Sequence, residues 1–343
     1  MAKAKKGFDF LKNKTLLITG GTGSFGSNFC KYALEHIALK KLIIFSRDEL
    51  KQSLMRKELG NDSRLRFFLG DVRDLPRLQR AFHGVDVVVH AAALKQIPSL
   101  EYNPFEAVKT NILGSQNVID AAIDQGVQKV LLVSTDKAAQ PINLYGSTKL
   151  CAEKLFISGN AYAPDETKFS CVRYGNVMGS RGSIIEELLK NPNQKTVSLT
   201  DERMTRFWIT LEQSFALVLF ALEHMMGGEI FIPKAPSMKL ADLFDVLAPN
   251  AKRNIVGIRP GEKLHETLLT HDESRHSVSL PNYFVNLPEH AEVFDVPVRF
   301  KKFFAQGKSL PSGFTYASDT NTEWLTKTAF ANVIKEKVIA RLL

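Results

Sequence analysis

Cysteine is scarce in this chain of 343 residues, which contains only Cys30, Cys151 and Cys171. Each lies inside an apolar segment, and the three show neither the paired spacing of a metal site nor that of a disulfide framework. The sequence therefore excludes a small, disulfide-stapled secreted domain. It predicts a reducing compartment, the cytoplasm.

Long apolar runs are also missing. The nearest to one is WITLEQSFALVLFALEHMM (208–226), which Glu212, Gln213 and Glu223 interrupt. A membrane helix needs ~20 apolar residues, so this stretch predicts a buried amphipathic helix instead. The basic first residues, MAKAKKGFDFLKNK, have no apolar core behind them and do not resemble a secretory signal. We expect no membrane partner.

Clustered charge and clustered metal ligands are missing too. The formal net charge is +9, but no basic run follows the first residues, so we expect no nucleic-acid partner. An anionic small substrate, or simply a basic proteome, accounts for the excess charge. The eight histidines show no metal-ligand spacing. We expect His265 and His271 to be structural or exposed, and no metal to be required.

The first half of the chain contains a regular alternation of short apolar runs and segments of helical spacing. This alternation predicts an α/β fold with a parallel, doubly wound sheet. Helical spacing is clear in FGSNFCKYALEHI (25–37) and NVIDAAIDQG (117–126). The runs, which are apolar enough to be strands buried on both faces, are 15–19, 41–45, 65–69, 86–90, 129–133 and, as a sixth strand, 169–173.

A glycine-rich loop follows the first predicted strand. In TGGTGSFG, Gly20, Gly23 and Gly26 form a Gly-x-x-Gly-x-x-Gly pattern that also contains Ser24 and Phe25. The glycines permit a tight turn and a close approach of the backbone to a pyrophosphate, and the next helix offers its N-terminal amides to the anion. Because the loop lies between a strand and a helix, it predicts a dinucleotide-binding Rossmann sheet.

The tip of the second strand bears on the choice of cofactor. NAD enzymes usually place an acidic residue there to hold the ribose hydroxyls, but this chain has Ser46 followed by Arg47. A hydroxyl and a guanidinium suit a 2′-phosphate better. The sequence therefore favours NADP, while nearby Asp48 leaves NAD open. After the third strand, Asp71 and Val72 are placed to meet the adenine.

After about residue 178 the alternation gives way to turn-rich pieces such as GSRGS, KNPNQ, IPKAPSMK and IRPGEK. We expect residues 1–178 to form the NADP-binding Rossmann domain. Residues 179–343 are expected to form mainly a smaller α/β substrate-binding cap, with some segments returning to the first domain. The cap should cover the carboxyl edge of the sheet, where ligands bind in such folds.

Two residue pairs after the fifth strand carry the predicted chemistry. In VSTDKAAQPINLYGSTK, Asp136 and Lys137 precede Tyr145 and Lys149, which are one helical turn apart. A free phenol, with a pKa ≈ 10, is a poor base at neutral pH, and a nearby cation favours the phenolate. We predict that Tyr145 is an acid/base and Lys149 its helper. The carboxylate beside a second lysine indicates a further acid–base step.

Taken together, these motifs resemble the extended short-chain dehydrogenase/reductase family over nearly the whole chain. The resemblance rests on TGGTGSFG, GDVRD, HAAAL, the Tyr145–Lys149 pair and RYGNV. It implies that Tyr145 takes a proton from a sugar hydroxyl while hydride leaves the same carbon. Lys149 would then lower the pKa of Tyr145 and bind the nicotinamide ribose. The resemblance also implies a tightly bound NADP, regenerated in each cycle, with Ala91 and Val177 beside it.

Within this family, the Asp136–Lys137 pair resembles the inverting UDP-N-acetylglucosamine 4,6-dehydratases that begin pseudaminic (nonulosonic) acid synthesis; many other dehydratases carry Asp-Glu. The stretches SRDELKQ, AAALKQIP, MTRFWIT and GIRPGEKLHE extend the resemblance. It implies that Lys137 removes the proton on carbon 5 and that Asp136, next to Thr135, protonates the leaving hydroxyl on carbon 6. Lys137 must be neutral when it acts, so we expect burial or Lys149 to lower its pKa.

The resemblance further implies a group of residues that hold the UDP-sugar. Guanidinium forks match the geometry of a diphosphate, and an acidic residue is expected on the uridine ribose. The implied substrate-binding residues are Lys95, Asn176, Arg181, Arg206, Arg259 and Glu262. The family tends to assemble through helices that flank the sheet, so a homo-oligomer is expected.

Two other functions stay open. A sugar-nucleotide epimerase or a retaining dehydratase of the same family would share Tyr145, but an epimerase acting at carbon 4 needs no acid–base pair at Asp136 and Lys137. A non-catalytic NADP-binding regulator would usually have lost Tyr145 or Lys149, and both are present. The presence of all four residues favours the dehydratase.

Overall fold

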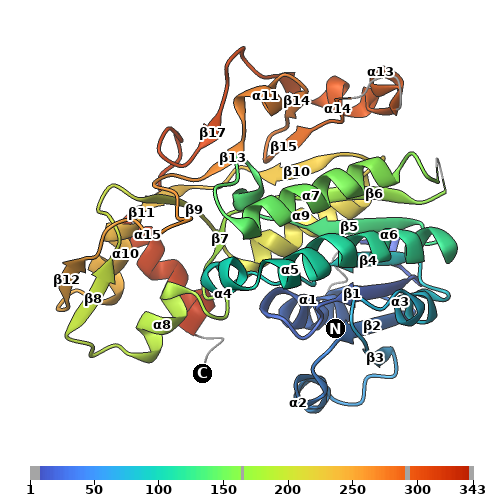
Figure 1. Ribbon diagram of the computed structural model, residues 1–343, viewed down its shortest axis with the longest axis horizontal. Helices are drawn as coiled ribbons and strands as arrows, with labels where there is room; N and C mark the ends of the chain where they lie inside the picture. Colours follow the sequence, from blue (N-terminus) through green and yellow to red (C-terminus); the bar gives the residue numbers. More distant parts are fainter. Residues whose placement is uncertain (1–7, 164–165, 290–293, 340–343) are drawn as a thin grey trace, which may run out of the picture.

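A ten-stranded sheet forms the centre of the computed structural model, which describes residues 8–163, 166–289 and 294–339. Its parallel part has the order β3-β2-β1-β4-β5-β6-β10 (Figure 1). The strand bounds are β1 (Thr15–Thr19), β2 (Lys41–Ser46), β3 (Leu65–Leu69), β4 (Val87–His90), β5 (Lys129–Val133), β6 (Lys168–Val172) and β10 (Ile230–Pro233). The predicted doubly wound α/β fold is confirmed, and each predicted strand lies within one residue of an observed one.

Antiparallel strands from the second half of the chain extend this sheet beyond β10. They are β15 (Tyr283–Asn286), β14 (Ser277–Ser279) and β16 (Lys308–Ser309). The large sheet thus takes strands from both sides of residue 178, and the domain boundary at that residue stays a prediction.

Helices pack on the sheet in two contacting groups, α3, α6 and α7 in one, and α1 and α9 in the other (Figure 1). Side-chain caps define several starts: Asp48 accepts from the Lys51 N–H at α2, and Asn143 accepts from the Gly146 N–H at α7. The bounds are α1 (Ser24–His36), α2 (Glu49–Leu59), α3 (Leu75–Phe82), α6 (Gly114–Asp124), α7 (Leu144–Gly159) and α9 (Leu211–His224).

The apolar stretch that starts at Trp208 is shorter as a helix than the sequence predicts. Trp208 and Ile209 end strand β9 (Thr205–Ile209), and α9 begins only at Leu211. Thr210 separates the two, because its side chain and that of Gln213 form a capping box at the helix start. The remainder of the stretch is the buried helix that was predicted.

A second, smaller hydrophobic core lies beside the large sheet and includes Trp208, Met238, Phe244 and Phe330. Two small sheets lie here. One contains β7 (Asn176–Val177), β9 and β11 (Ser237–Lys239), and the other contains β8 (Thr196–Leu199) and β12 (Lys252–Ile255). The helices are α8 (Ile184–Lys190), α10 (Leu240–Leu247) and α15 (Lys327–Val333), followed by the π-helical η4 (Ile334–Ile339). The end of the described chain thus returns to this core (Figure 1).

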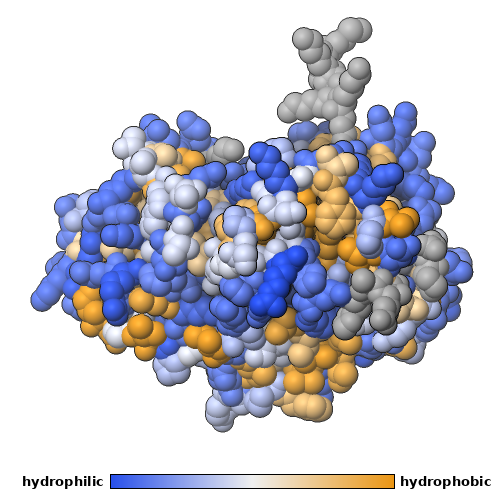
Figure 2. Space-filling model, turned by 90° about the horizontal axis from the view of Figure 1, so that it is seen from above, coloured by the Kyte–Doolittle hydropathy of each residue, from blue (hydrophilic) through white to orange (hydrophobic). Residues whose placement is uncertain are grey.

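The remaining elements are short. They are η1 (Asp9–Leu11), α4 (Ile97–Tyr102), α5 (Pro104–Ala107), the π-helical η2 (Val108–Leu113), η3 (Asp136–Ala138), β13 (Thr267–Leu269), α11 (His271–Ser274), α13 (Val296–Arg299), α14 (Lys301–Gln306) and β17 (Tyr316–Ala317). On the surface, hydrophilic residues cover most of the face shown in Figure 2, and hydrophobic residues gather in smaller patches along its lower edge and in its upper right part. Within the described residues, no helix combines the length and the apolar character needed to cross a bilayer.

The strand order reverses between β1 and β4. The chain after β1 runs outward to β2 and β3, and the later strands continue on the other side of β4. A crevice forms at such a reversal, outside the carboxyl ends of the strands. The loops after β1, β4 and β5 all open there, and they carry the glycine loop, Lys95 and the Asp136–Lys137 pair.

Candidate active site

The glycine loop has the geometry that a pyrophosphate needs. Gly20 has φ 65°, and a Cβ on it would lie 2.8 Å from Ala92. A Cβ on Gly26 would lie 2.6 Å from the Gly20 oxygen, so the helix can approach the loop only without a side chain. Gly23, the N-cap of α1, provides no side-chain cap bond to the first amides. The helix terminus is thus free to bind an anion.

Three cavities follow one another along the carboxyl edge of the sheet. We call them the β2-side cavity (about 570 Å³), the central cavity (about 470 Å³) and the outer cavity (about 500 Å³). The first two share Gly20, Gly23, Ala91 and Ala93 in their linings. The central and outer cavities share Asn176, Val177, Ser180 and Gly182. Together they are large enough for two extended ligands that meet in the middle.

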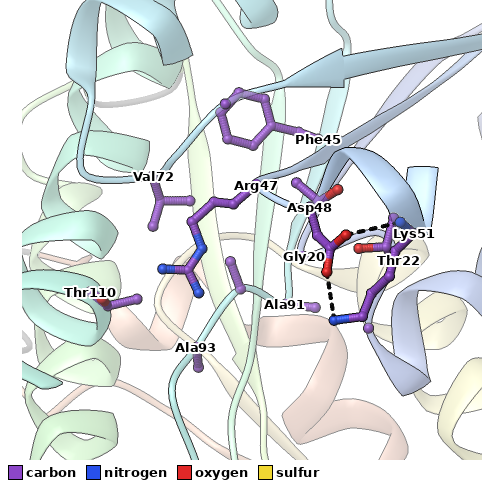
Figure 3. Close-up of a pocket in the computed structure, with 14 residues that line it drawn as sticks. Gly20, Thr22, Phe45, Arg47, Asp48, Lys51, Val72, Ala91, Ala93 and Thr110 are labelled. Atoms are coloured by element: carbon purple, nitrogen blue, oxygen red, sulfur yellow. Dashed lines mark hydrogen bonds and ion pairs between the residues drawn. The ribbon is translucent and has the colours of Figure 1, made fainter. Parts of the chain in front are cut away.

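The β2-side cavity contains a pair of basic side chains. Arg47 reaches into it on the side of Val72 and Thr110 (Figure 3). On the other side, the Lys51 Nζ lies 2.8 Å from an Asp48 carboxylate oxygen, and the Lys51 N–H donates to the other oxygen at 2.9 Å. Asp48 is therefore occupied as the N-cap of α2.

Two residues predicted to bind the cofactor are engaged in other contacts. Ser46 is buried, and its Oγ accepts a hydrogen bond from Gln52 Nε2 at 3.0 Å. Asp71 lies beside the cavity rather than in its lining, with Arg73 Nη2 at 2.7 Å and Arg47 Nη1 at 3.8 Å. Arg47 therefore lines the cavity and also faces the Asp71 carboxylate.

The central cavity brings together the residues of the predicted catalytic stretch. Tyr145, Lys149, Thr135 and Lys137 all line it. Lys149 Nζ donates to the Val133 carbonyl at 2.9 Å, and burial lowers the pKa of this lysine to about 8. The remaining lining includes the predicted residues Gly20, Gly23, Ser24, Phe25, Gly26, Ala91, Lys95, Asn176 and Val177.

The pKa of Tyr145 is raised in the structure, whereas the resemblance implied that it is lowered. Burial raises it to about 12, which outweighs the opposing effects of Lys137 and of a hydrogen bond with Thr135. The cation that lowers the pKa of Tyr145 in this structure is therefore Lys137, whereas the sequence analysis assigned that role to Lys149.

Asp136 and Lys137 form a partly buried ion pair, in which the Lys137 side chain is 24% exposed. Asp136 is 1% exposed, and its Oδ1 accepts from Thr135 Oγ1 at 2.9 Å and from Lys137 Nζ at 3.0 Å. Lys137 Nζ also lies 3.3 Å from Oε1 of Glu266.

The pKa of Lys137 is raised, and the expectation that it is lowered is wrong. Burial alone would lower it, but the carboxylates of Asp136 and Glu266 more than offset this effect. Lys137 is thus an ammonium in the structure, hydrogen-bonded to the carboxylate that was predicted to be its partner in catalysis.

The predicted substrate-binding arginines have different surroundings. Arg259 and Glu262 line the outer cavity, and Thr200 Oγ1 donates to Glu262 at 3.4 Å. Arg206 also lines it, but its guanidinium already donates to the carbonyls of Thr205, Leu264 and Lys263 at 2.7, 3.0 and 2.9 Å. It therefore ties β9 to the segment that carries Glu262.

Arg181 is exposed and is outside the lining of all three cavities. Its backbone N–H donates to Ser24 Oγ at 3.1 Å, which joins the loop after β7 to the start of α1. A role of its guanidinium in substrate binding stays a prediction.

The sequence analysis assigned no role to Ser134, Lys51 and Trp208, which line these cavities, or to Glu266, which contacts Lys137. Buried atoms without a hydrogen-bond partner among the described residues include Ser134 Oγ, in the central cavity, and Trp208 Nε1, in the outer one. Ser134 follows β5 directly, and Lys51 comes three residues after the strand-tip Asp48, so both carried a local signal. Glu266 and Trp208 lie in the stretches GIRPGEKLHE and MTRFWIT that extended the resemblance. No local pattern pointed to a role for either side chain, because each reaches the site from far away in the sequence.

In the described part of the chain, no group of three or more His, Cys, Asp or Glu side chains is arranged so that it could hold a metal ion. His265 Nδ1 lies 2.8 Å from Thr205 Oγ1, and the side chain of His271 is 52% exposed. These surroundings agree with the structural or exposed positions expected for the two histidines.

Known proteins share both the sequence and the fold. Residues 16–288 match a family described as polysaccharide biosynthesis protein. A Campylobacter jejuni protein named UDP-N-acetylglucosamine 4,6-dehydratase (inverting) is 47% identical over 329 residues, or 94% of this chain and 97% of that protein. A Rickettsia conorii protein named UDP-glucose 4-epimerase is 43% identical and covers 86% of this chain and 88% of its own.

A solved structure extends the likeness to three dimensions. Pen from Bacillus thuringiensis superposes with a TM-score of 0.86 at 39% identity, covering 97% of this chain and all of that one (100%). The matched region includes the glycine loop, the Tyr145–Lys149 couple and the Asp136–Lys137 pair. The chain therefore belongs to the polysaccharide biosynthesis protein family of extended short-chain dehydrogenases/reductases.

Proposed function

We propose that this protein is a UDP-N-acetylglucosamine 4,6-dehydratase that inverts carbon 5. The observation that carries the proposal is the position of the partly buried Asp136–Lys137 pair, beside the cavity that Tyr145 and Lys149 line. Tyr145 and Lys149 can then assist the oxidation of a sugar, and Asp136 and Lys137 can assist the loss of water from the same sugar, without its release. The similarity to the Campylobacter jejuni dehydratase over nearly the whole chain supports the same assignment.

The residues divide the reaction into two parts. Tyr145 accepts the proton of the carbon 4 hydroxyl, and a bound nicotinamide would accept the hydride of that carbon and return it to carbon 6. Oxidation at carbon 4 makes the carbon 5 proton acidic. Lys137 removes that proton, and Asp136 protonates the hydroxyl that leaves carbon 6 as water. Reprotonation of carbon 5 from the opposite face inverts its configuration.

The ion pair in the structure is one proton transfer away from the form that this chemistry needs. Lys137 is an ammonium and Asp136 a carboxylate, with 3.0 Å between Nζ and Oδ1. Moving the shared proton to Asp136 creates an amine base and a carboxylic acid in one step. No proton has to come from solvent, so burial of the pair does not prevent its activation.

The finer choice of cofactor, NADP, has support in the β2-side cavity. Arg47 and Lys51 are two cations next to the place where the ribose of a dinucleotide would lie. Asp48 is occupied by Lys51 and by the helix N-terminus, so it is a poor partner for a free 2′-hydroxyl. The glycine loop fits the pyrophosphate of either dinucleotide.

An epimerase is the second candidate, because the Rickettsia conorii relative carries that name. Epimerisation at carbon 4 uses Tyr145 but leaves the Asp136–Lys137 pair without a task. A non-catalytic NADP-binding regulator would have no use for either couple. The partly buried ion pair is the feature that favours dehydration.

The deciding experiment incubates purified protein with UDP-N-acetylglucosamine in deuterated water. We expect a 4-keto, 6-deoxy product with solvent deuterium on carbon 5 and inverted configuration, observed by NMR, and loss of one water by mass spectrometry. The hydrogen that arrives on carbon 6 should come from carbon 4 of the same sugar. Formation of UDP-N-acetylgalactosamine alone would support the epimerase, and retained configuration at carbon 5 would exclude the inverting assignment.

Pathway, assembly and compartment belong to the same proposal. A product of this kind fits the first step of nonulosonic (pseudaminic) acid synthesis for surface glycans. Exposed apolar side chains on α4, α5 and η2, namely Tyr102, Phe105 and Leu113, support a homo-oligomer. Three cysteines without disulfide bonds are consistent with the cytoplasm.

A further inference from the structure

Glu266 is a buried carboxylate that reaches the catalytic pair from the other half of the chain. It is 2% exposed and lies directly before β13. Its backbone is held on both sides by Ser318, whose Oγ accepts from the Glu266 N–H at 2.9 Å and whose N–H donates to the Glu266 carbonyl at 2.8 Å. Because Ser318 Oγ also lies 2.7 Å from Thr205 Oγ1, β9 supports this position too.

The carboxylate of Glu266 is surrounded by cations. Its Oε1 lies 3.3 Å from Lys137 Nζ and 3.8 Å from Arg206 Nε, and its Oε2 lies 3.9 Å from Lys263 Nζ. Oε2 has no hydrogen-bond partner among the described residues. Lys137 Nζ thus lies between two fixed carboxylates, those of Asp136 and Glu266.

We propose that Glu266 is a positioning residue for the Asp136–Lys137 pair: its carboxylate holds Lys137 Nζ beside Asp136 and keeps in the site the single proton that the pair shares. This inference rests on the proposed dehydratase function. Arg206 and Lys263 face the buried Glu266 carboxylate at 3.8 and 3.9 Å and balance its charge. Its backbone is fixed, so it contributes a defined contact point rather than a mobile charge.

The charged surroundings of Lys137 explain why a second carboxylate is needed. Cations and a phenol face the same ammonium, and together with burial they weaken its hold on the proton. Without that proton, Asp136 could not become the acid for the carbon 6 hydroxyl. The titratable and charged groups around Lys137 are Asp136, Glu266, Arg206, Lys263, Lys95 and Tyr145. The net effect of these groups is to raise the pKa of Lys137.

The first test measures the Glu266–Lys137 contact without using the activity. The full-length protein and its Glu266→Gln variant are labelled at pH 9 with a trace of acetic anhydride, which reacts with amines and not with ammonium groups. Mass spectrometry of peptides then gives the labelling of Lys137 relative to exposed Lys154. Loss of one nearby opposite charge lowers a pKa by about 1–3 units, so Lys137 should be labelled at least ~10-fold more in the variant. Asp272→Asn, which removes an exposed carboxylate, should leave the labelling unchanged.

The second test follows the two halves of the reaction in the same proteins. Glu266→Gln should oxidise carbon 4 normally but lose water about 10- to 100-fold more slowly, since small misplacement of a catalytic group costs this much. Its dehydration should also decline at a lower pH than that of the wild type. Glu266→Asp, which keeps the charge, should recover part of both effects, whereas a mere folding defect would not be rescued in this way.

Two results would overturn the proposal: equal labelling of Lys137 in wild type and Glu266→Gln, or unchanged dehydration in a variant whose labelling has risen. Thermal unfolding shows whether each variant folds. If Glu266→Gln does not fold, Glu266→Asp is compared with the wild type instead. A wild-type protein that leaves UDP-N-acetylglucosamine intact would contradict the proposed function instead, and the labelling result would still decide the contact.

Discussion

Arg47 and Lys51 are the residues through which this protein would distinguish the two dinucleotides. We expect Arg47→Ala to weaken NADP binding about 10- to 100-fold, because a charge-assisted contact to phosphate contributes ~1.5–3 kcal/mol. NAD binding should change little. Calorimetric titration of both dinucleotides measures the difference, and Lys51→Ala should act in the same direction.

Lys57→Ala is the matched control for these two variants, because Lys57 is exposed on α2, the helix that carries Lys51, and is outside the lining of the β2-side cavity. It should leave both affinities unchanged. If Arg47→Ala reduced the affinity for both dinucleotides equally, the assignment of NADP would fail.

Variants of Lys137 and Tyr145 should separate the two halves of the proposed reaction. Lys137→Ala should retain some hydride transfer from carbon 4, since Tyr145 and Lys149 are intact, although it removes the cation that lowers the pKa of Tyr145. It should fail to lose water. The variant would accumulate reduced cofactor or a 4-keto sugar that keeps its carbon 6 hydroxyl. Absorbance of the reduced nicotinamide reports the first, and mass spectrometry reports the second.

Tyr145→Phe should block both halves, with a loss of about two or more powers of ten, the range for a positioned acid–base group. Substrate binding should hardly change, because the ring remains. Lys154→Ala removes an exposed lysine from the same helix and serves as the control. Wild-type dehydration by Lys137→Ala would show that a different residue is the base.

The β1–α1 loop is the element through which we expect a dinucleotide to bind. A Cβ on Gly26 would lie 2.6 Å from the Gly20 oxygen and 2.7 Å from Gly21 Cα, both backbone atoms that cannot move alone. Gly26→Ala should therefore destabilise the fold by ~1–3 kcal/mol and weaken the binding of either dinucleotide. Urea unfolding and calorimetry measure the two effects.

Lys31→Ala provides the comparison on the same helix, since its side chain is 55% exposed. It should change neither stability nor dinucleotide affinity appreciably. A Gly26→Ala protein of wild-type stability would mean that the helix can shift away from the loop, against the close approach in the structure.

At the scale of the whole molecule, the buried Lys149 links stability to pH. Burial lowers its pKa to about 8 from 10.5, so the folded protein holds the proton less tightly than the unfolded chain. The cost of the buried charge is complete below about pH 8 and is relieved as the pH rises toward 10.5. Each pKa unit corresponds to about 1.4 kcal/mol.

Lys149→Met should therefore gain stability relative to the wild type at pH 7, and this relative gain should shrink by at least ~1 kcal/mol at pH 10. The lost hydrogen bond to Val133 shifts both values equally and does not affect the comparison. Denaturant unfolding of protein freed of nucleotide measures it at the two pH values. A difference that is constant from pH 7 to pH 10 would contradict the depressed pKa of Lys149.

Features that depend on local pattern could be predicted from the amino-acid sequence. Short apolar runs define the strands, because a strand buried on both faces needs apolar residues throughout, and β1 to β6 lie where these runs are. The glycine spacing after β1 predicted a loop whose glycines are required by close backbone contacts. Tyr145 and Lys149 share a helix, so their spacing alone suggested a couple, whereas the roles predicted for the adjacent Asp136 and Lys137 came from the family resemblance.

The tertiary structure decided what depends on groups far apart in the chain. Glu266 reaches Lys137 only through the packing of the segment before β13 against η3. Together with Asp136, it reverses the expected direction of the Lys137 pKa. Arg206 looks like a ligand for a diphosphate in the sequence, but backbone carbonyls of a distant segment take up its hydrogen bonds. The strength of a buried charge is set by every charge and dipole around it, and the fold alone brings those together.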